Sequence, residues 1–430
     1  MIKNIFNTFF VRIASAVINL LIAIIISRYL GAEIKGEQGI FLTSVSLLHI
    51  IMSVVGLGAI VYLLPRISYT KLIVPTYVWI GIISIVSIFI LPIIQPTLSI
   101  YSTHIIIITS ILTITNVHIS TFIAREKIIL ANTLTLIQIG LLILSLLLCI
   151  FILKQQTVYS YIYSLYISYS TTLLICYIVS YKHFTCKFKE ISINTIIQSG
   201  KELLHYGFFN QLDIFAQMLS FRFSYYILSS YVGNKEVGVY SVSVSIIESI
   251  WLISRSISSV QHARIVNTRD FSANTQLTIQ FIKIGSFLTC IAIVVLLLVP
   301  NSLYIFIFGN EFFEVKSIIV VLSPGVAFFG TSFMISGLFS GIGKQYINSI
   351  AAITGLIATI AGAYITIPIW GIYGAAATAT IAYTATTVVK LVYFKQQAHI
   401  SWNSFLITKQ DIAYGKQEII ARLSKYGLYR

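Results

Sequence analysis

Long apolar runs recur along the whole chain, separated by short polar segments. Twelve runs are long enough to cross a membrane, at about 9–28, 38–64, 73–94, 104–124, 130–153, 158–181, 206–230, 237–260, 284–308, 317–341, 346–367 and 371–394. About 20 apolar residues in a helix span a hydrocarbon core of about 30 Å. Because lipid offers the backbone no hydrogen-bond partners, such runs fold as helices. The pattern therefore predicts an all-α polytopic membrane protein with about twelve transmembrane helices.

Composition and charge support this class. Hydrophobic residues make up 57% of the chain and charged residues 10%, whereas a soluble domain carries about 25% charged residues. The net charge of +15 would suggest nucleic-acid binding in a soluble protein, but here the basic residues lie mainly in short loops. If the N-terminus is cytoplasmic, inner segments hold about four times as many Lys and Arg residues as the 5 in outer loops. This bias indicates orientation. We expect a bacterial inner-membrane protein with both termini cytoplasmic and no nucleic-acid partner.

A short motif occurs twice, 202 residues apart. Its copies are Ser27-x-Tyr29-x-Gly31-x4-Gly36 and Ser229-x-Tyr231-x-Gly233-x4-Gly238, and each follows an odd-numbered span. Six spans separate the copies, so the two halves would be parallel repeats, a plan in which transporters bind substrate between the halves. We predict two parallel six-helix bundles around a central cavity, at 1–182 and 206–395, with a cytoplasmic linker at 183–205 and a cytoplasmic tail at 396–430.

Ionisable side chains inside apolar spans are costly, by roughly 2.5–3.5 kcal/mol, and so indicate functional sites. Three arginines and two acids occur at this depth, and arginine suits phosphate because its planar group donates paired hydrogen bonds. We therefore expect an anionic, phosphate-bearing cargo. The candidate substrate-binding residues are Arg12, Asn19, His49, Asn210, Gln217, Arg222 and Arg255, and the candidate ion-coupling residues are Asp213 and Glu248.

Helical spacing leaves alternatives open at several of these positions. Polar stripes along the spans line either a wet cavity or a hydrogen-bonded helix seam. Arg12 could instead extend to the inner headgroups. Arg222 and Asp213 lie on opposite faces of one span, so one of them would pair with a neighbouring helix. Glu248 and Arg255 are seven residues apart, a rise of about 10 Å, which excludes a direct salt bridge between them.

The sequence offers no catalytic pattern. It contains no Walker motif, no metal-ligand cluster and no nucleophile–base spacing, so we predict no enzymatic activity, no cofactor and no metal. All predicted outer loops are short, which argues against a membrane glycosyl polymerase, because such an enzyme needs an outer loop to hold its catalytic groups. A multidrug cation antiporter is the other alternative, and it would need more acids than arginines in its cavity.

Several segments resemble Wzx-type polysaccharide flippases of the multidrug/oligosaccharidyl-lipid/polysaccharide exporter superfamily. The similar segments are Ser27–Glu33, Gly36–Glu37, Leu64–Arg66, Ala124–Lys127 with Asn132, Gly341–Lys344, Ile367–Pro368 and Trp370–Ala377. The resemblance implies twelve or more spans, two six-span bundles and a basic cavity. It also implies export of sugar repeat units on polyprenyl pyrophosphate, for O-antigen, capsule or a related envelope polysaccharide.

The resemblance implies partners as well. These are the lipid-linked oligosaccharide, membrane lipid, a coupling H+ or Na+, and a polysaccharide polymerase complex. Related lipid II flippases keep arginines in spans one, two and eight. Arg12 and Arg255 match spans one and eight in kind, whereas span two of this chain has His49 in place of an arginine.

Overall fold

The computed structural model describes residues 2–94, 96–183, 192–266 and 270–405. Within these ranges the chain forms helices, turns and short loops and no β-strand. This confirms the predicted all-α class. The predicted tail lies mostly outside the described residues, because the last helix ends at Ala398 and a short 3-10 turn follows at Trp402–Phe405.

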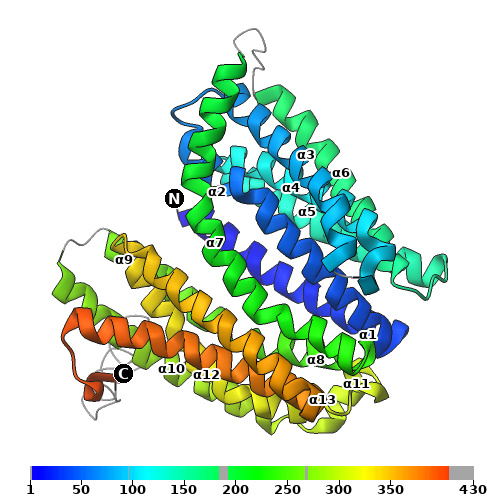
Figure 1. Cartoon of the computed structure of the whole chain (residues 1–430), viewed down its shortest axis with the longest axis vertical. Helices are drawn as coiled ribbons and strands as arrows, with labels where there is room; N and C mark the ends of the chain where they lie inside the picture. Colours follow the sequence, from blue (N-terminus) through cyan, green and yellow to red (C-terminus); the bar gives the residue numbers. More distant parts are fainter. Residues whose placement is uncertain (1, 95, 184–191, 267–269, 406–430) are drawn as a thin grey trace, which may run out of the picture.

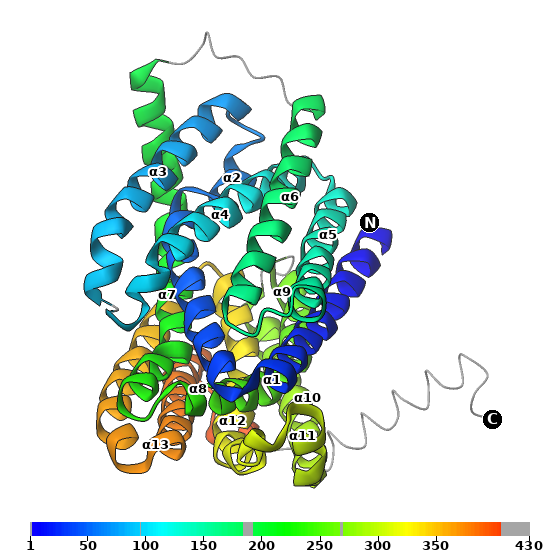
Figure 2. The ribbon, with the colours of Figure 1, turned by 90° about the vertical axis from the view of Figure 1, so that its right-hand side faces the viewer.

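The N-terminal bundle is formed by the elements from α1 to α6 (Figures 1 and 2). Its elements are α1 (Ile2–Met52), η1 (Ser53–Val55), α2 (Leu57–Leu63), α3 (Tyr69–Ile94), η2 (Pro96–Tyr101), α4 (Ser102–Ala124), α5 (Ile128–Leu147), η3 (Leu148–Ile152) and α6 (Tyr159–His183). The C-terminal bundle follows with α7 (Ile193–Tyr231), α8 (Asn234–Glu248), α9 (Trp251–Val266), α10 (Phe271–Leu298), α11 (Asn301–Phe308), η5 (Asn310–Phe312), α12 (Val315–Gly341) and α13 (Gln345–Ala398).

Eight helices of the described chain are long and apolar enough to cross a membrane, or nine if the bent pair α8 and α9 counts as one span. Two of the eight are 54 residues long, at Phe10–Leu63 and Gln345–Ala398. At 1.5 Å per residue each would extend about 80 Å, so each makes two passes. Gly31 (φ 87°) and Gly371 (φ 53°) break them, and this backbone conformation suits glycine. The two broken helices make two passes each, the other six make one each, and the bent pair α8 and α9 makes one. Helix α7 supplies the twelfth predicted span.

The predicted ninth span, 284–308, was wrong in its limits. The structure has α10 over Phe271–Leu298 and a separate short α11 over Asn301–Phe308. The first turns of α10 carry polar residues that suggested a loop. Asn274, Thr275 and Thr278 are in fact buried, and the Thr278 hydroxyl accepts a hydrogen bond of 2.8 Å from the Gln261 side chain of α9. Polar contacts between helices thus extend this span beyond its apolar run.

The repeated motif joins the two bundles. Gly31 and Gly233, at equivalent places in the two copies, both adopt positive φ, 87° and 134°. Five residues further on, Gly36 of α1 faces Gly238 of α8, and the backbones of the two helices are so close there that a Cβ on either glycine would overlap the other helix. We call this end of the molecule, at Gly31 and Gly233, the crossing end. From it the two bundles diverge (Figure 1).

Helix α7 lies along both bundles (Figures 1 and 2). Its first half packs on the N-terminal bundle, where the Cα of Gly207 is close to the backbone of Val54. Its second half packs on α13 of the C-terminal bundle, where the Ser220 and Thr359 hydroxyls are 2.9 Å apart. The segment predicted as a linker, 183–205, is therefore helical from Ile193 onward.

Candidate functional site

Two of the predicted substrate-binding arginines lie near each other, one from each bundle. Arg12 is exposed on the first turns of α1, and Arg255 is exposed on α9. The charged groups that act on Arg255 are Glu248, Arg222 and Arg12. The guanidinium of Arg255 is 5.1 Å from the centre of the Phe333 ring of α12, which holds its stem on the bundle surface. Asn19 is exposed on α1, two turns from Arg12.

Arg222 and Glu248 form a bidentate ion pair inside the C-terminal bundle. The Arg222 nitrogens Nη1 and Nη2 donate to the two Glu248 oxygens at 3.1 and 2.7 Å. The Tyr383 hydroxyl of α13 donates to Glu248 Oε1 at 2.7 Å. Their side chains are 19% and 12% exposed. The pair thus ties α7, α8 and α13 together, which is the pairing with a neighbouring helix that the spacing of Asp213 and Arg222 allowed.

The ion pair of Arg222 and Glu248 affects which charges are left between the bundles. Glu248 already has a full positive partner and a third hydrogen bond, so its charge is offset locally. Arg12 and Arg255 are then the charges that remain for a ligand among the predicted intramembrane residues nearby. Because they come from different bundles, a bound anion with two phosphates could contact both.

His49 lies inside the N-terminal bundle, between α1 and α4. Its Nε2 is 3.2 Å from Asn116 Nδ2, an atom that only donates, so Nε2 accepts. Its Nδ1 is 2.9 Å from Thr113 Oγ1, and that hydroxyl donates to the Thr109 carbonyl at 2.7 Å. Nδ1 therefore carries the proton, and the imidazole is neutral. In this arrangement His49 acts as a polar link between helices and does not supply the positive charge that an arginine would.

Asp213 on α7 accepts a hydrogen bond of 3.0 Å from Gln345 Nε2 at the start of α13. Asp213 is half-buried, and the charged residue that acts on it is Lys390 of α13. Gln217, one turn further along α7, is also half-buried. Asn210 lies on the same helix, but its side chain is outside the described part of the structure. The two predicted ion-coupling carboxylates, Asp213 and Glu248, thus each face a basic residue of the protein itself.

Two buried lysines were missed by the sequence analysis. Lys390 is 2% exposed and Lys35 is 7% exposed. Lys390 lies four residues before the predicted end of the last span. A lysine this close to the end of a span can reach the headgroups, so its charge did not indicate a buried group. Lys35 lies between Gly31 and Gly36 and was placed in an outer loop, whereas its ammonium is buried and donates to Gln38 Oε1 at 2.6 Å. Tyr383, the third member of the Arg222 and Glu248 cluster, had no signal in the sequence.

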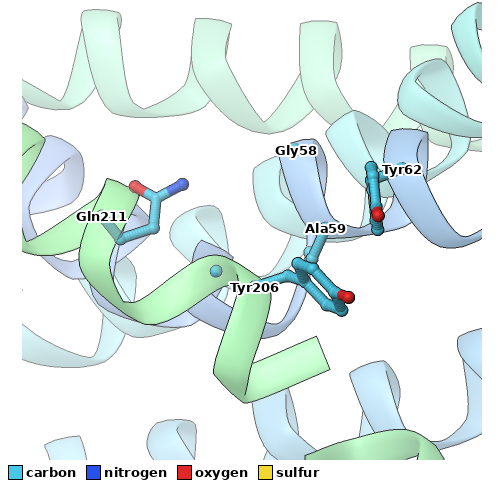
Figure 3. Close-up of a pocket in the computed structure, with 7 residues that line it drawn as sticks. Gly58, Ala59, Tyr62, Tyr206 and Gln211 are labelled. Carbon is cyan, nitrogen blue, oxygen red and sulfur yellow. The ribbon is translucent and has the colours of Figure 1, made fainter. Parts of the chain in front are cut away.

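A cavity of about 240 Å³ opens between α2 and α7, at the end away from the crossing end (Figure 3). The residues that line it are Gly56, Gly58, Ala59, Tyr62, Tyr206, Gly207 and Gln211. The Tyr62 and Tyr206 rings are 4.6 Å apart, and the Arg66 guanidinium lies 4.0 Å from the centre of the Tyr62 ring. Gly207 lets α7 approach the Val54 backbone closely beside the cavity, and the two tyrosine rings line it.

Comparisons with known proteins agree with this architecture. No protein-family model matches the chain. The capsular polysaccharide biosynthesis protein CapF of Staphylococcus aureus is 24% identical over 178 residues. This match covers 40% of the present chain and 44% of CapF, so it spans less than half the length of that curated relative.

Two solved structures are similar over most of their length. The inward-facing conformation of a multidrug resistance MATE family transporter of the MOP superfamily has a TM-score of 0.73 at 17% identity, covering 90% of this chain and 94% of that one. The lipid II flippase MurJ, in an inward closed conformation, has a TM-score of 0.72 at 17% identity, covering 94% and 89%. The chain is therefore a multi-pass membrane protein with the fold of MOP-superfamily transporters, as the sequence resemblance indicated.

Proposed function

We propose that this protein is a flippase that moves polyprenyl-pyrophosphate-linked oligosaccharides from the cytoplasmic to the outer leaflet, for O-antigen, capsule or a related envelope polysaccharide. The observation that carries the proposal is that Arg12 of α1 and Arg255 of α9 supply one exposed guanidinium from each bundle, close enough for the Arg12 charge to act on Arg255. A pyrophosphate offers several oxygens to such a pair, and arginine binds them through paired donors. The partial match to a capsular polysaccharide biosynthesis protein supports a sugar-linked cargo.

Alternating access would follow from the two-bundle plan. In this proposal the crossing end faces outward and is closed, and the end with Arg12 faces the cytoplasm. The excess of Lys and Arg predicted on the inner side supports this orientation. In this orientation both termini would lie in the cytoplasm, with the protein in a bacterial inner membrane. The two solved structures named above were described in inward conformations, whereas an outward-facing MATE transporter has a lower TM-score of 0.64. This order is consistent with closure at the crossing end.

The membrane potential could drive this export. Moving charge across a membrane is worth about 2.3 kcal/mol per elementary charge per 100 mV. A pyrophosphate with about two negative charges would thus gain about 4–5 kcal/mol at 100 mV when it leaves a negative interior. Transport in vesicles should then accelerate with the donor side negative, and indifference to an imposed potential would exclude this drive.

A multidrug cation antiporter is the second candidate, because a MATE transporter shares the fold. A cationic drug would need an acid that is free to bind it. Glu248 is instead held by Arg222 and Tyr383, and Asp213 faces Lys390. The charges near the divide between the bundles therefore favour an anion. A polymerase complex as partner stays a prediction from the resemblance.

The decisive experiment measures lipid-linked oligosaccharide in a deletion strain, both its amount and the leaflet in which it lies. Wild type, Arg12→Ala, Arg255→Ala and the double variant are each added back. Arg125→Ala, at the exposed turn after α4, is the matched control. We expect repeat units to accumulate on the cytoplasmic face without the protein, and only wild type and the control to clear them fully. Normal amount and sidedness in the deletion strain would exclude this cargo and favour the antiporter.

A further inference from the structure

The cavity between α2 and α7 has an unpaired polar group on its wall. Gln211 of α7 lines the cavity and is 6% exposed. Its side-chain amide makes no hydrogen bond to any residue that the structure describes. A buried amide without a partner is unfavourable, and this amide offers N–H donors and an acceptor oxygen. The missing partner of Gln211 is therefore a ligand, or water that a ligand can replace.

Aromatic rings form another part of the cavity wall. Tyr62 of α2 and Tyr206 of α7 are 43% and 46% exposed, and their ring centres are 4.6 Å apart. The Arg66 guanidinium lies 4.0 Å from the centre of the Tyr62 ring and stacks on it. Tyr206 is thus the ring with a face to offer a ligand, and Tyr62 supports it. In Figure 3 the two rings lie at one end of the lining and Gln211 lies at the other.

The size and the lining of the cavity limit what it can hold. Its volume is about 240 Å³, whereas a cavity of about 150 Å³ in another protein binds benzene. The cavity is therefore large enough for one six-membered ring with its substituents. Besides the two tyrosines and Gln211, its lining consists of glycines and one alanine. Among the side chains of the lining, only the Gln211 amide and the tyrosine hydroxyls can therefore form hydrogen bonds with a ligand.

We propose that this cavity binds one pyranose ring of the cargo, with the ring on Tyr206 and a hydroxyl on the Gln211 amide. A pyranose has a face of C–H groups and a rim of hydroxyls. The C–H groups carry a slight positive charge, which the negative face of an aromatic ring attracts, and the hydroxyls donate and accept, as an amide requires. The cavity would select among sugars, whereas Arg12 and Arg255 would bind the pyrophosphate. The proposal rests on the flippase function proposed above.

Two other roles fit these residues less well. Tyrosines at the end of a span can anchor it at the headgroups, but Tyr62 and Tyr206 contact each other across two helices and line a cavity. A lipid chain could fill the cavity, but it has no group that bonds to Gln211, so the amide would stay unpaired. A sugar satisfies both the aromatic ring and the amide.

The test is saturation-transfer NMR of sugars that bind reversibly to the full-length protein. The protein is placed in lipid nanodiscs, because maltoside detergents carry sugars of their own. The probes are the methyl glycosides of a hexose, an N-acetylhexosamine, a deoxyhexose and a hexuronic acid. Sorbitol, which has the hydroxyls but no ring, is the control ligand. Farnesyl phosphate is added as a competitor to test the lipid alternative. Titration of each signal gives a dissociation constant.

At least one methyl glycoside should bind wild type, and its ring C–H protons should receive the strongest transfer. Tyr206→Leu removes the aromatic face and should weaken binding about two- to tenfold, whereas Tyr206→Phe keeps that face and should bind nearly as wild type does. Gln211→Leu removes the amide and should also weaken binding about two- to tenfold. Tyr346→Leu, at an exposed tyrosine at the start of α13, is the matched control. Thermal unfolding of each variant checks that it is folded.

Four results would overturn the proposal. The first is that no glycoside binds wild type, and the second is that sorbitol binds as well as the glycosides. The third is that Tyr206→Leu and Gln211→Leu, both folded, bind the glycosides as wild type does. The fourth is displacement of the bound glycoside by farnesyl phosphate, which would assign the cavity to a lipid chain.

This readout is separate from the deletion-strain experiment. If lipid-linked sugars are normal in a deletion strain while a glycoside binds and requires Tyr206, then the cargo assignment fails and the sugar site stands. If the lipid-linked sugars accumulate while no glycoside binds, the sugar site fails and the flippase assignment stands.

Discussion

Gly36 and Gly238 pack against each other's helix reciprocally. A Cβ on Gly36 would lie 1.8 Å from the Asn234 carbonyl oxygen, and a Cβ on Gly238 would lie 1.9 Å from the Ala32 carbonyl oxygen. Since 202 residues separate Gly36 from Gly238 and also Ala32 from Asn234, the contact has an approximate two-fold axis. The repeated sequence motif is therefore the element by which the two halves meet.

Gly36→Ala should weaken closure at the crossing end. The added methyl group meets backbone that cannot rotate away, and such overpacking costs about 1–3 kcal/mol. Spin labels across the crossing end should report a larger open population, and transport should fall. Gly81→Ala, where the added Cβ meets nothing within 4 Å, is the matched control. An unchanged distance distribution in Gly36→Ala would show that the helices separate elsewhere.

Loss of one member of the Arg222 and Glu248 pair should destabilise the C-terminal bundle. Breaking a buried pair costs about 3–5 kcal/mol, because the remaining charge has no partner, and the partial exposure of 19% and 12% should bring the cost toward the lower value. Glu248→Gln should therefore lower the thermal unfolding temperature in detergent. The double variant Arg222→Met with Glu248→Leu should recover most of that loss, since replacing both charges removes the unpaired one. Equal stability of the single and double variants would contradict this account.

Glu311 should matter more for its bond to α1 than for its salt bridge. Its Oε2 accepts from the Ala32 backbone nitrogen at 2.7 Å, just after the break at Gly31, and this backbone hydrogen bond holds the pKa of the Glu311 carboxyl below its usual value. The Lys235 ammonium is 3.3 Å from Oε1, but both side chains are about half exposed, at 54% and 45%. Exposed pairs contribute about 0–1 kcal/mol.

We therefore expect Glu311→Ala to shift the bundles toward separation at the crossing end, and Lys235→Met to have a small effect in the same distance measurement. Because the pKa of Glu311 is lowered, its contribution is present above the ordinary carboxyl pKa and is lost as the pH falls through the lowered value. Acidification to well below the ordinary carboxyl pKa should reproduce part of the Glu311→Ala effect in wild type. Equal effects of the two substitutions would assign the role to the salt bridge instead.

Two glycines of α7 should respond oppositely to alanine. At Gly207 the new Cβ would lie 1.8 Å from the Val54 carbonyl oxygen, whereas at Gly200 its nearest neighbour is Pro75 Cβ at an ordinary 3.7 Å. Gly207→Ala should lose about 1–3 kcal/mol of stability. Gly200→Ala should gain up to about 1 kcal/mol from helix propensity. Thermal unfolding of both variants measures this difference, and a stable Gly207→Ala would show that α7 can move away from the N-terminal bundle freely.

The sequence was sufficient for the helices but not for their polar contacts. Apolar runs predicted α3, α4, α5, α6 and α12 closely, because each of these helices is apolar over most of its length. The apolar pattern failed at the start of α10, where Asn274 is buried and Thr278 accepts a hydrogen bond from Gln261 of α9. Hydropathy measures the free energy of moving a side chain from water to lipid. It carries no information on hydrogen-bond partners supplied by neighbouring helices.

The sequence indicated which charged residues lie inside the spans, but it did not indicate which of them bind each other. Depth in a span predicted Arg222 and Glu248 as costly charges, but only the packing of α7 against α8 shows that they bind each other. Lys390 went unnoticed because a lysine near the end of a span can reach the headgroups. Its burial depends on α12 covering that side of α13, where Ser332 and Ser336 lie. No local pattern in α13 reports this.

The path of α7 implies that the two halves are not interchangeable modules. Although the repeat divides the sequence near its middle, the helix that opens the second half leaves its first turns on the first half, with Gly207 against Val54. In a C-terminal half produced alone, the first part of α7 would lose its contacts with the N-terminal bundle. An N-terminal half alone would lack the α7 residues that line its cavity. Fragments cut between the halves should therefore need each other to fold, and chimaeras with related transporters should work only when α7 is exchanged together with the helices of the N-terminal bundle that it touches.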